Sequence, residues 1–394
     1  MGRNYIGNAA AVFFIFPSIG YAVFFIGTSL KLHQLAYSGT VIGVTYAAFH
    51  ISSMIGSLFI PRALYNYYRH FLIASVLALV LAGASVACTT SWVVILLLFS
   101  IIGLLYSALA PALTYAMTHA RNDLKQIVIA LTIPQNFGWC LGFLVGAVSC
   151  YIFKNLNMAF IVASLSALPA LLFAKPIIKI LNTVTRRENK ISQTRDYRSY
   201  RKLLLLFYSS ILLGFFASSI FFTALPPLLS ILGLSNFEIY IARFVGAALA
   251  TLSYVITIEV MLKNLKKVLV RVSQSMFIRG LMFITFLIAY IEHAHIIVFI
   301  TTIIVLSVIG IAWSYLNTGI KIVTLCFGEE AHRILGTVNF LISLGFITGS
   351  VVSGILLDLC RSSIPTISGI LALAAAGLYL ITSHELTKSK LITC

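Results

Sequence analysis

Apolar stretches long enough to cross a bilayer follow one another along almost the whole chain, with short polar turns between them. A spanning helix needs about 20 consecutive apolar residues. Because these runs are apolar on every face and too long for the strands of a membrane barrel, they indicate an all-α integral membrane protein. The twelve transmembrane helices are expected near residues 6–30, 38–60, 71–90, 92–117, 127–152, 157–174, 203–228, 236–259, 268–291, 296–322, 334–357 and 364–382.

One basic polar segment interrupts this pattern near the middle of the chain. Residues 175–202 have six expected helices before them and six after them. A segment of this kind is typical of a connection between two helical units. We therefore expect an N-terminal six-helix bundle over residues 1–174, a cytoplasmic basic linker over residues 175–202, and a C-terminal six-helix bundle over residues 203–394.

Residues of the first half recur in the second half at a nearly constant spacing. One match joins the fifth and eleventh expected helices at an offset of 203 residues, and another joins the fourth and tenth at an offset of 207. The first pairs Asn136, Phe137, Leu141, Gly142, Phe143, Gly146 and Val148 with Asn339, Phe340, Leu344, Gly345, Phe346, Gly349 and Val351; the second pairs Ser100, Gly103 and Ser107 with Ser307, Gly310 and Ser314. Because chance seldom gives two helix pairs one register, we expect the two bundles to be pseudo-symmetric.

The chain has a net charge of +17, and its lysines and arginines are concentrated in the polar turns between the spans. With the N-terminus inside, most lysines and arginines fall on the inner side, and only Lys31, Lys154 and Arg361 fall outside. Positive residues stay on the cytoplasmic side of membrane proteins. We therefore expect a multi-pass protein of the cytoplasmic membrane with both termini in the cytoplasm, and no nucleic-acid partner.

Two short motifs add to the architecture. The fifth expected helix contains Gly138-Trp-Cys-Leu-Gly142-Phe-Leu-Val-Gly146-Ala, and the turn before the eleventh reads Gly328-Glu-Glu-Ala-His-Arg333-Ile-Leu-Gly. With two halves of six helices, these motifs make the chain resemble the major facilitator superfamily over residues 6–382. The resemblance implies tight helix packing by the glycine run and a gating role for Arg333.

The chain departs from the family pattern at two places. The fifth-helix motif of the antiporter branches is Gly-x-x-x-Gly-Pro-x-x-Gly-Gly, whereas Phe143 stands here for the proline and Ala147 for the last glycine. This weakens an inference of antiport. The loop between the second and third helices normally carries an aspartate that latches the cytoplasmic gate, but residues 61–70 lack it and keep only Arg69 as the candidate gating residue.

The resemblance implies a secondary active transporter that moves a small solute by alternating access, with efflux or organic-anion transport as candidate activities. A facilitative uniporter is the alternative, and a transporter-like solute sensor is a weaker one because the linker is short. An intramembrane enzyme is disfavoured, since Lys388 stands where a zinc-binding motif beginning at His384 needs a second histidine. We expect a monomer in the lipid bilayer with a small-molecule substrate, a proton or ion as candidate coupling partner, and no cofactor or metal.

Polar side chains on the expected helices mark where a water-filled path runs, because polar groups at bilayer depth must face protein or water. On the second helix, Gly43, Tyr46 and His50 form one stripe at steps of three and four. The candidate substrate-binding residues are Tyr46, His50, Asn136, Arg243, Arg279, Ser314 and Asn317. For a single serine or glycine, close helix packing is the alternative explanation. We expect Gly138, Gly142 and Gly146 to lie where the halves meet, and Gly345 and Gly349 to serve in close helix packing.

Two arginines within the spans are the sharper candidates. Arg279 lies about eleven residues into its helix, roughly 16 Å from the start, which is deep for snorkelling. It is expected to contact either the substrate or a structural carbonyl. Arg243 lies nearer a helix start and is expected either to bind an anionic group of the substrate or to reach the outer headgroups.

The titratable candidates for proton coupling are few. They are His50 within a span and Glu238, Glu259 and Asp358 toward helix ends. For His50, a hydrogen-bonded interior histidine is the alternative to a proton carrier. The first and fourth helices carry no carboxylate, although proton-coupled members of the family commonly hold one there.

Overall fold

The computed structural model describes residues 3–58, 68–119, 124–175, 177, 201–292, 294–327 and 331–388. Every regular element in these segments is helical. The first group comprises α1 (Arg3–Gln34), α2 (Gly39–Leu58), α4 (Tyr68–Cys88), α5 (Trp92–His119), α6 (Leu124–Phe153), α7 (Leu156–Leu165) and the 3-10 helix η1 (Leu168–Phe173). The second comprises α9 (Arg201–Ile231), α10 (Asn236–Lys263), η3 (Leu265–Lys267), α11 (Val268–Thr285), α12 (Leu287–Glu292), α13 (His295–Leu325), α14 (Ala331–Leu359) and α15 (Ser363–Lys388).

These elements follow the expected helices closely, with two interruptions. The sixth expected helix divides into α7 and η1, and Pro169 lies at the start of η1. Proline has no backbone N–H to continue an α-helix, and α7 ends a few residues before it. The ninth expected helix divides into α11 and α12 after Thr285. Within the described segments, nine helices are long and apolar enough to cross a membrane.

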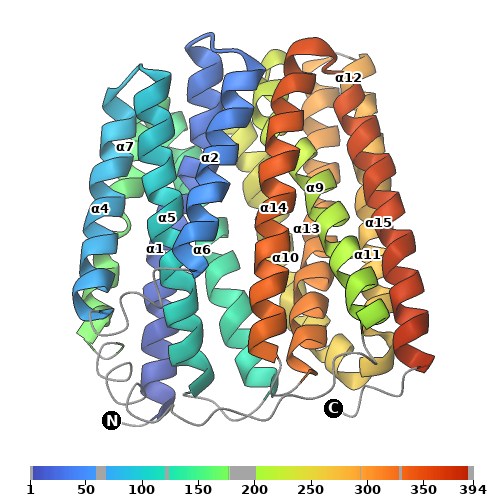
Figure 1. Ribbon diagram of the computed structural model, residues 1–394. Helices are drawn as coiled ribbons and strands as arrows, with labels where there is room; N and C mark the ends of the chain where they lie inside the picture. Colours follow the sequence, from blue (N-terminus) through green and yellow to red (C-terminus); the bar gives the residue numbers. More distant parts are fainter. Residues whose placement is uncertain are drawn as a thin grey trace.

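The helices run side by side, and both chain termini lie at the same end of the molecule (Figure 1). We call this the terminal end and the opposite one the far end. Elements α1 to η1 pack mainly on one another and form the N-terminal set; α9 to α15 do the same and form the C-terminal set. Between the sets, the most extensive packing is of α2 on α14 and of α6 on α10.

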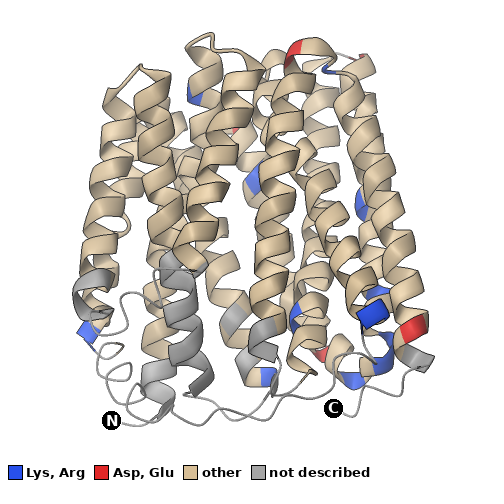
Figure 2. Ribbon diagram, viewed as in Figure 1, with Lys and Arg blue, Asp and Glu red and all other residues tan. Residues whose placement is uncertain are grey.

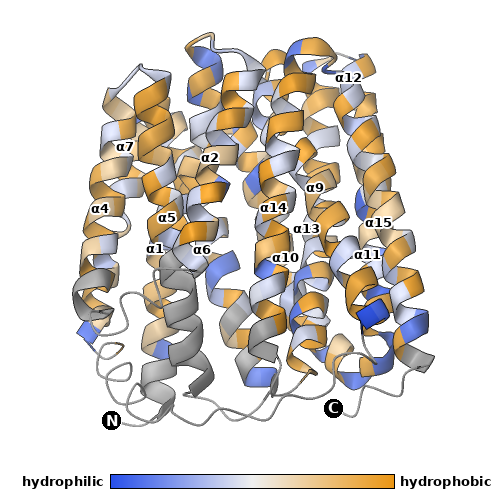
Figure 3. Cartoon of the chain, viewed as in Figure 1, coloured by the Kyte–Doolittle hydropathy of each residue, from blue (hydrophilic) through white to orange (hydrophobic). Residues whose placement is uncertain are grey.

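The outward surface of the helices is apolar over most of its height, as the orange colouring in Figure 3 shows. Large aliphatic side chains are exposed there, with Leu172 80% exposed and Leu252 69% exposed. Lysines and arginines gather toward the terminal end, as Figure 2 shows. In water such a surface would be unfavourable, so its apolar band fits contact with lipid.

The glycines of α6 allow neighbouring helices to approach closely, but not all of them at the seam between the sets. A Cβ added to Gly138 would lie 2.6 Å from the Ile15 carbonyl oxygen, and one added to Gly142 would lie 2.5 Å from that of Ile19. Both contacts are with α1, within the N-terminal set, and so differ from the expectation. Only Gly146 lies against the other set, 2.6 Å by the same measure from the ring of Tyr240 on α10.

The glycines of α14 also pack within their own set. An added Cβ at Gly345 would lie 3.0 Å from the Leu212 carbonyl oxygen, and at Gly349 2.6 Å from that of Phe216, both on α9. The prediction of close packing holds for Gly345 and Gly349, whereas the neighbouring helix predicted for Gly138 and Gly142 was wrong. Helical periodicity shows that one face is small; it does not show which helix covers that face.

Candidate functional site between the two helix sets

Arg279 lies in the middle of α11 with no exposed surface. Its Nη2 donates to the Ser218 hydroxyl of α9 at 2.8 Å. The guanidinium carbon also lies 5.6 Å, 5.8 Å and 5.1 Å from the ring centres of Phe222, Phe283 and Trp313. Its Nε and Nη1 have no hydrogen-bond partner among the described residues. The cation is therefore packed against hydroxyl and aromatic groups, and most of its donors remain unused.

Arg243 points from α10 toward the same aromatic ring. Its guanidinium carbon lies 4.8 Å from the centre of the Phe222 ring. Its Nε and Nη2 are buried and lack a hydrogen-bond partner within the described segments. Phe222 thus contacts both arginines, and the Arg243 side chain faces α9 instead of running toward the far end of its own helix.

The described acidic side chains form no ion pair with these arginines, although Glu238 lies only five residues before Arg243 on α10. The sequence has ten acidic residues, and those in described segments lie near helix ends: Glu238, Glu259, Glu292, Asp358 and Glu385. Among the described residues, neither Arg243 nor Arg279 forms an ion pair. The charge on the two guanidiniums is therefore left without a neighbouring carboxylate from the described part of the chain.

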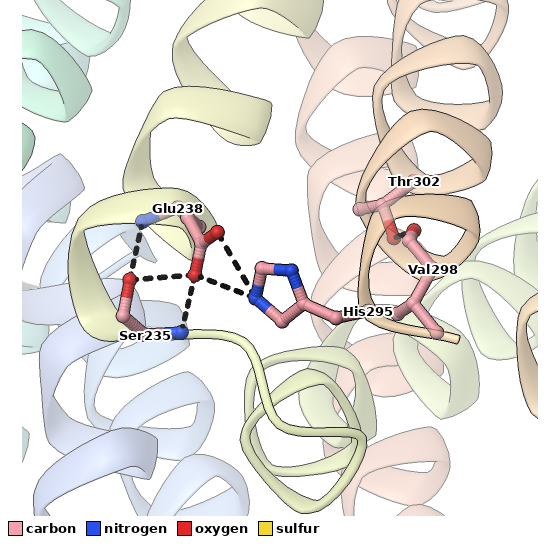
Figure 4. Close-up of polar contacts among 5 residues, drawn as sticks. All are labelled: Ser235, Glu238, His295, Val298 and Thr302. Atoms are coloured by element: carbon pink, nitrogen blue, oxygen red, sulfur yellow. Dashed lines mark hydrogen bonds and ion pairs between the residues drawn. The ribbon is translucent and has the colours of Figure 1, made fainter. Parts of the chain in front are cut away.

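The carboxylate of Glu238 is hydrogen-bonded at the start of α10 (Figure 4). Its carboxylate accepts hydrogen bonds from the backbone N–H of Ser235 at 2.8 Å and from the Ser235 hydroxyl at 2.7 Å. It also lies 3.1 Å from Nε2 of His295. This cap could have been predicted from the sequence, because a serine followed three residues later by a glutamate is the pattern of a capping box. Glu238 therefore caps a helix, which leaves it less suited to proton transfer.

His50 is part of a row of aromatic rings that crosses from one set to the other, stacked at its first contact and edge-on at the next two. Its ring lies 4.7 Å from that of Phe346 on α14, nearly parallel at 15°. Phe346 contacts Phe215 at 5.6 Å, and Phe215 contacts Trp313 at 5.9 Å. His50 Nε2 has no hydrogen-bond partner among the described groups. The row leads from α2 to the Trp313 ring that lies against Arg279.

Three other candidates use their polar groups within the protein. The Tyr46 hydroxyl donates to the carbonyl oxygen of Phe25. The Asn317 amide donates to the Tyr254 hydroxyl at 2.9 Å, and the Asn136 amide donates to the Thr132 carbonyl oxygen at 2.7 Å. These three side chains therefore form hydrogen bonds to other groups of the protein.

Ser314 is a fourth such residue. Its hydroxyl accepts from Ser253 at 2.8 Å, contacts Thr257 at 2.9 Å, and donates to the Ile311 carbonyl oxygen at 2.8 Å. Ser253 and Thr257 lie on α10 and Ser314 on α13. This network fastens two helices of the C-terminal set, which is the packing alternative foreseen for single serines.

At the far end, Asp358 of α14 caps the first turn of α2. Its Oδ1 accepts from the Gly39 N–H at 2.6 Å, and its Oδ2 accepts from the Thr40 N–H at 2.8 Å and from the Thr40 hydroxyl at 2.6 Å. A carboxylate is favourable at a helix N-terminus, where backbone N–H groups are unpaired. The sequence showed Asp358 near a helix end but not that it contacts the other set.

Close backbone packing continues this contact toward the centre. A Cβ added to Gly43 of α2 would lie 2.9 Å from the Gly354 Cα on α14. On the α1 and α10 side, the Gln34 amide donates to Asn236 at 3.1 Å, and the Tyr240 hydroxyl donates to the Val23 carbonyl oxygen at 3.0 Å. The two sets are thus held together at the far end by several independent contacts.

At the terminal end, the described contact between the sets is of another kind. Lys125 of α6 and Glu259 of α10 form an ion pair at 2.9 Å, with both side chains about half exposed. An exposed pair of this type contributes only about 0–1 kcal/mol. The side chains of Arg69 and Arg333, the gating candidates, lie outside the described part of the structure.

Known proteins agree with this arrangement of helices. The family model described as Major Facilitator Superfamily matches residues 6–349. The chain belongs to this superfamily. It is therefore a multi-pass membrane transporter and not an enzyme, as the sequence predicted. No curated protein sequence matches the chain.

Solved structures of two transporters share the fold of this superfamily member. A bacterial homologue of the human lysosomal transporter Spinster, in an inward-facing and unoccupied conformation, is similar with a TM-score of 0.68 and 12% identity over 98% of each chain. The nucleoside transporter NupG is similar with a TM-score of 0.62 and 16% identity, again over 98% of each chain. At these identities the likeness concerns the fold.

Lys31, which the charge pattern placed on the outer side, is an example of a role that the sequence did not reveal. It is 5% exposed near the end of α1. Its Nζ donates to the carbonyl oxygens of Val86 and Ala87 at 2.6 Å and 2.9 Å, and to Oδ1 of Asn157 at 2.9 Å. The two carbonyl groups belong to the last turn of α4, where a cation is favourable. Lys31 therefore joins α1, α4 and α7.

Proposed function

We propose that this protein is a secondary active transporter that moves a small solute across the cytoplasmic membrane by alternating access. In this proposal the two helix sets are pseudo-symmetric six-helix bundles, residues 1–174 and 203–394, that rock about a central site. The basic linker over residues 175–202 and both termini face the cytoplasm. The confinement of extensive contacts between the sets to α2 with α14 and α6 with α10 supports this division.

The observation that carries the proposal is the closure of the far end. Asp358 caps α2, Gly43 meets Gly354, and Gln34 bonds to Asn236, so three contacts would have to separate for that end to open. They involve hydrogen bonds and van der Waals packing between the sets, which can reform after each cycle. With the termini in the cytoplasm, this is the outward-closed state of a transporter.

Among the candidate residues, we place the substrate near Arg243, Arg279 and His50. Each has buried nitrogen atoms without a hydrogen-bond partner among the described residues, whereas Tyr46, Asn317 and Ser314 use their polar groups in the protein. An unpaired buried donor is costly unless a ligand completes it. Efflux or uptake of organic anions fits this placement, and a proton or another ion is the candidate coupling partner.

The test is a reversible lock on the far end. In a background without other cysteines, Gln34→Cys with Asn236→Cys is bridged in proteoliposomes by a short bifunctional methanethiosulfonate reagent, because the hydrogen bond joins the tips of two longer side chains. Flux of organic anions, sugars and drugs is followed with and without a pH gradient; crosslinking should stop flux, and a reductant should restore it. The matched control is Ser219→Cys with Ser350→Cys, whose hydroxyl oxygens lie 3.0 Å apart within one set; crosslinking there should leave flux intact.

The same assay separates the alternatives. Flux that depends only on the concentration gradient of the solute, and on no imposed ion gradient, identifies a facilitative uniporter. Binding of a solute without any flux identifies a sensor. Flux that persists with the Gln34 and Asn236 positions crosslinked would contradict alternating access through separation of the two sets.

A further inference from the structure

The two arginines of the C-terminal set share one aromatic side chain. The Phe222 ring centre lies 4.8 Å from the Arg243 guanidinium carbon and 5.6 Å from that of Arg279. The two guanidinium carbons are therefore at most about 10 Å apart, the sum of those distances. Two positive charges this close within the membrane repel each other unless something of opposite charge lies between or beside them.

The described part of the chain does not supply that opposite charge. Its acidic residues lie near helix ends, where Glu238 caps α10 and Asp358 caps α2. The Ser218 hydroxyl and the aromatic rings offset part of the cost of burying Arg279, but they are neutral. Nε and Nη1 of Arg279 and Nε and Nη2 of Arg243 still lack acceptors within the described segments. These four nitrogen atoms are therefore available to acceptors other than those of the described segments.

From these observations we infer that Arg243 and Arg279 form one site for an organic dianion, such as a dicarboxylate with an apolar body. The inference rests on the proposed transport function and names its substrate class. One anionic group pairs with each guanidinium, which can offer a carboxylate two parallel N–H donors. The apolar body lies against the aromatic rings beside the arginines, such as Phe222 and Trp313.

In this site Phe222, whose ring contacts both guanidiniums, would have to move for a ligand to reach the deeper arginine. Arg279 has no exposed surface, whereas Phe222 and Arg243 are partly exposed. A ligand that first binds Arg243 reaches Arg279 when the Phe222 side chain rotates away. The second pairing therefore requires a local rearrangement that a monoanion bound to Arg243 alone does not induce.

The experiment compares ligands of one shape and different charge. Purified full-length protein in detergent is titrated with terephthalate, 4-carbamoylbenzoate and terephthalamide, which carry two, one and no negative charges, and binding is measured by calorimetry and thermal shift. Terephthalate should bind at least tenfold more tightly than the monoanion, and the neutral diamide should not bind measurably. Equal binding of the dianion and the monoanion, or no stabilisation by terephthalate, succinate or phenyl phosphate, overturns the inference.

Variants then test whether both arginines are involved. Arg243→Gln and Arg279→Gln should each abolish the tenfold preference for the dianion, because only one guanidinium remains. The matched control is Arg271→Gln on the same helix as Arg279, since Arg271 donates to the Val260 carbonyl oxygen and is not part of the pair. Preference retained in either site variant refutes the two-arginine site, and the wild-type ligand series decides the question if a variant does not fold.

Flux measurements keep this inference distinct from the proposed function. Dianion binding that depends on both arginines, without any flux in proteoliposomes, would reject transport and keep the site. Flux of neutral solutes together with no preference for dianions would reject the site and keep transport.

Discussion

Two buried polar clusters, one in each helix set, differ in how completely their hydrogen bonds are formed. In the N-terminal set, the Tyr106 hydroxyl bonds to the Ser18 hydroxyl at 2.9 Å and accepts from the Gln135 amide at 3.2 Å. In the C-terminal set, Arg279 has one such bond, to Ser218, and leaves two nitrogen atoms without partners among the described residues. A neutral cluster with complete hydrogen bonds stabilises the fold, whereas an incomplete charged one costs stability.

The packing around these clusters is alike in the two sets. Glycines of α6 meet α1 and glycines of α14 meet α9, at Gly142 and Gly345 in particular. Likewise Gly103 of α5 meets α2, and Gly310 of α13 meets α10. The same framework of close helix contacts thus surrounds a neutral polar cluster in the N-terminal set and a cationic one in the C-terminal set.

The largest expected effect comes from disturbing the shared framework. Gly142→Leu and Gly345→Leu each place a side chain where a Cβ already meets a backbone atom at 2.5 Å or 3.0 Å, so we expect each to lower the free energy of unfolding by about 3 kcal/mol. Thermal unfolding in detergent measures this. The control is Gly377→Leu, because nothing lies within 4 Å of a Cβ there. A large effect in only one set would show that the two frameworks are not equivalent.

A smaller effect of opposite sign is expected at the charged cluster. Arg279→Met removes a buried charge that lacks an ion-pair partner in the described structure, so we expect stability to rise by about 2 kcal/mol while dianion flux is lost. Melting temperature and flux are measured on the same preparation. A fall in melting temperature would show that the Ser218 bond and the ring contacts outweigh the desolvation of the guanidinium.

The smallest effect is expected at the neutral cluster. Tyr106→Phe removes the hydroxyl that joins Ser18 and Gln135, and should cost about 1 kcal/mol with flux nearly unchanged. A flux defect without a change in melting temperature would place Tyr106 in the substrate path and end the contrast between the clusters. Ser166→Ala, which loses one hydroxyl bond within the N-terminal set, is the control for a hydrogen bond of ordinary strength.

Much of the fold follows from local sequence, because the length of an apolar run determines whether it can cross a bilayer. The tenth expected helix, 296–322, is α13 at His295–Leu325, and the seventh, 203–228, is α9 at Arg201–Ile231. Pro169 explains the break in the sixth. Such features depend on residues close in the chain, and so a single sequence contains them.

The candidate site was only partly predictable. The depth of Arg279 follows from its position along one helix, but its contact with Ser218 depends on how α9 and α11 are rotated about their axes. The same limit applies to Gly138 and Gly142, which meet α1, and to His50, whose stacking on Phe346 joins two sets. Pairings between distant helices are decided by the packing of the whole bundle, to which each helix contributes only one face.

Lys31 joins the ends of α1, α4 and α7 into one hydrogen-bonded unit at the far end. The neighbouring α2 has no such tie to α4 in its described contacts at this end and is held by Asp358 of the other set. Under the proposed alternating access, we expect the far end to separate between α2 and α14 and between α1 and α10, while the three helices joined by Lys31 move as one rigid body.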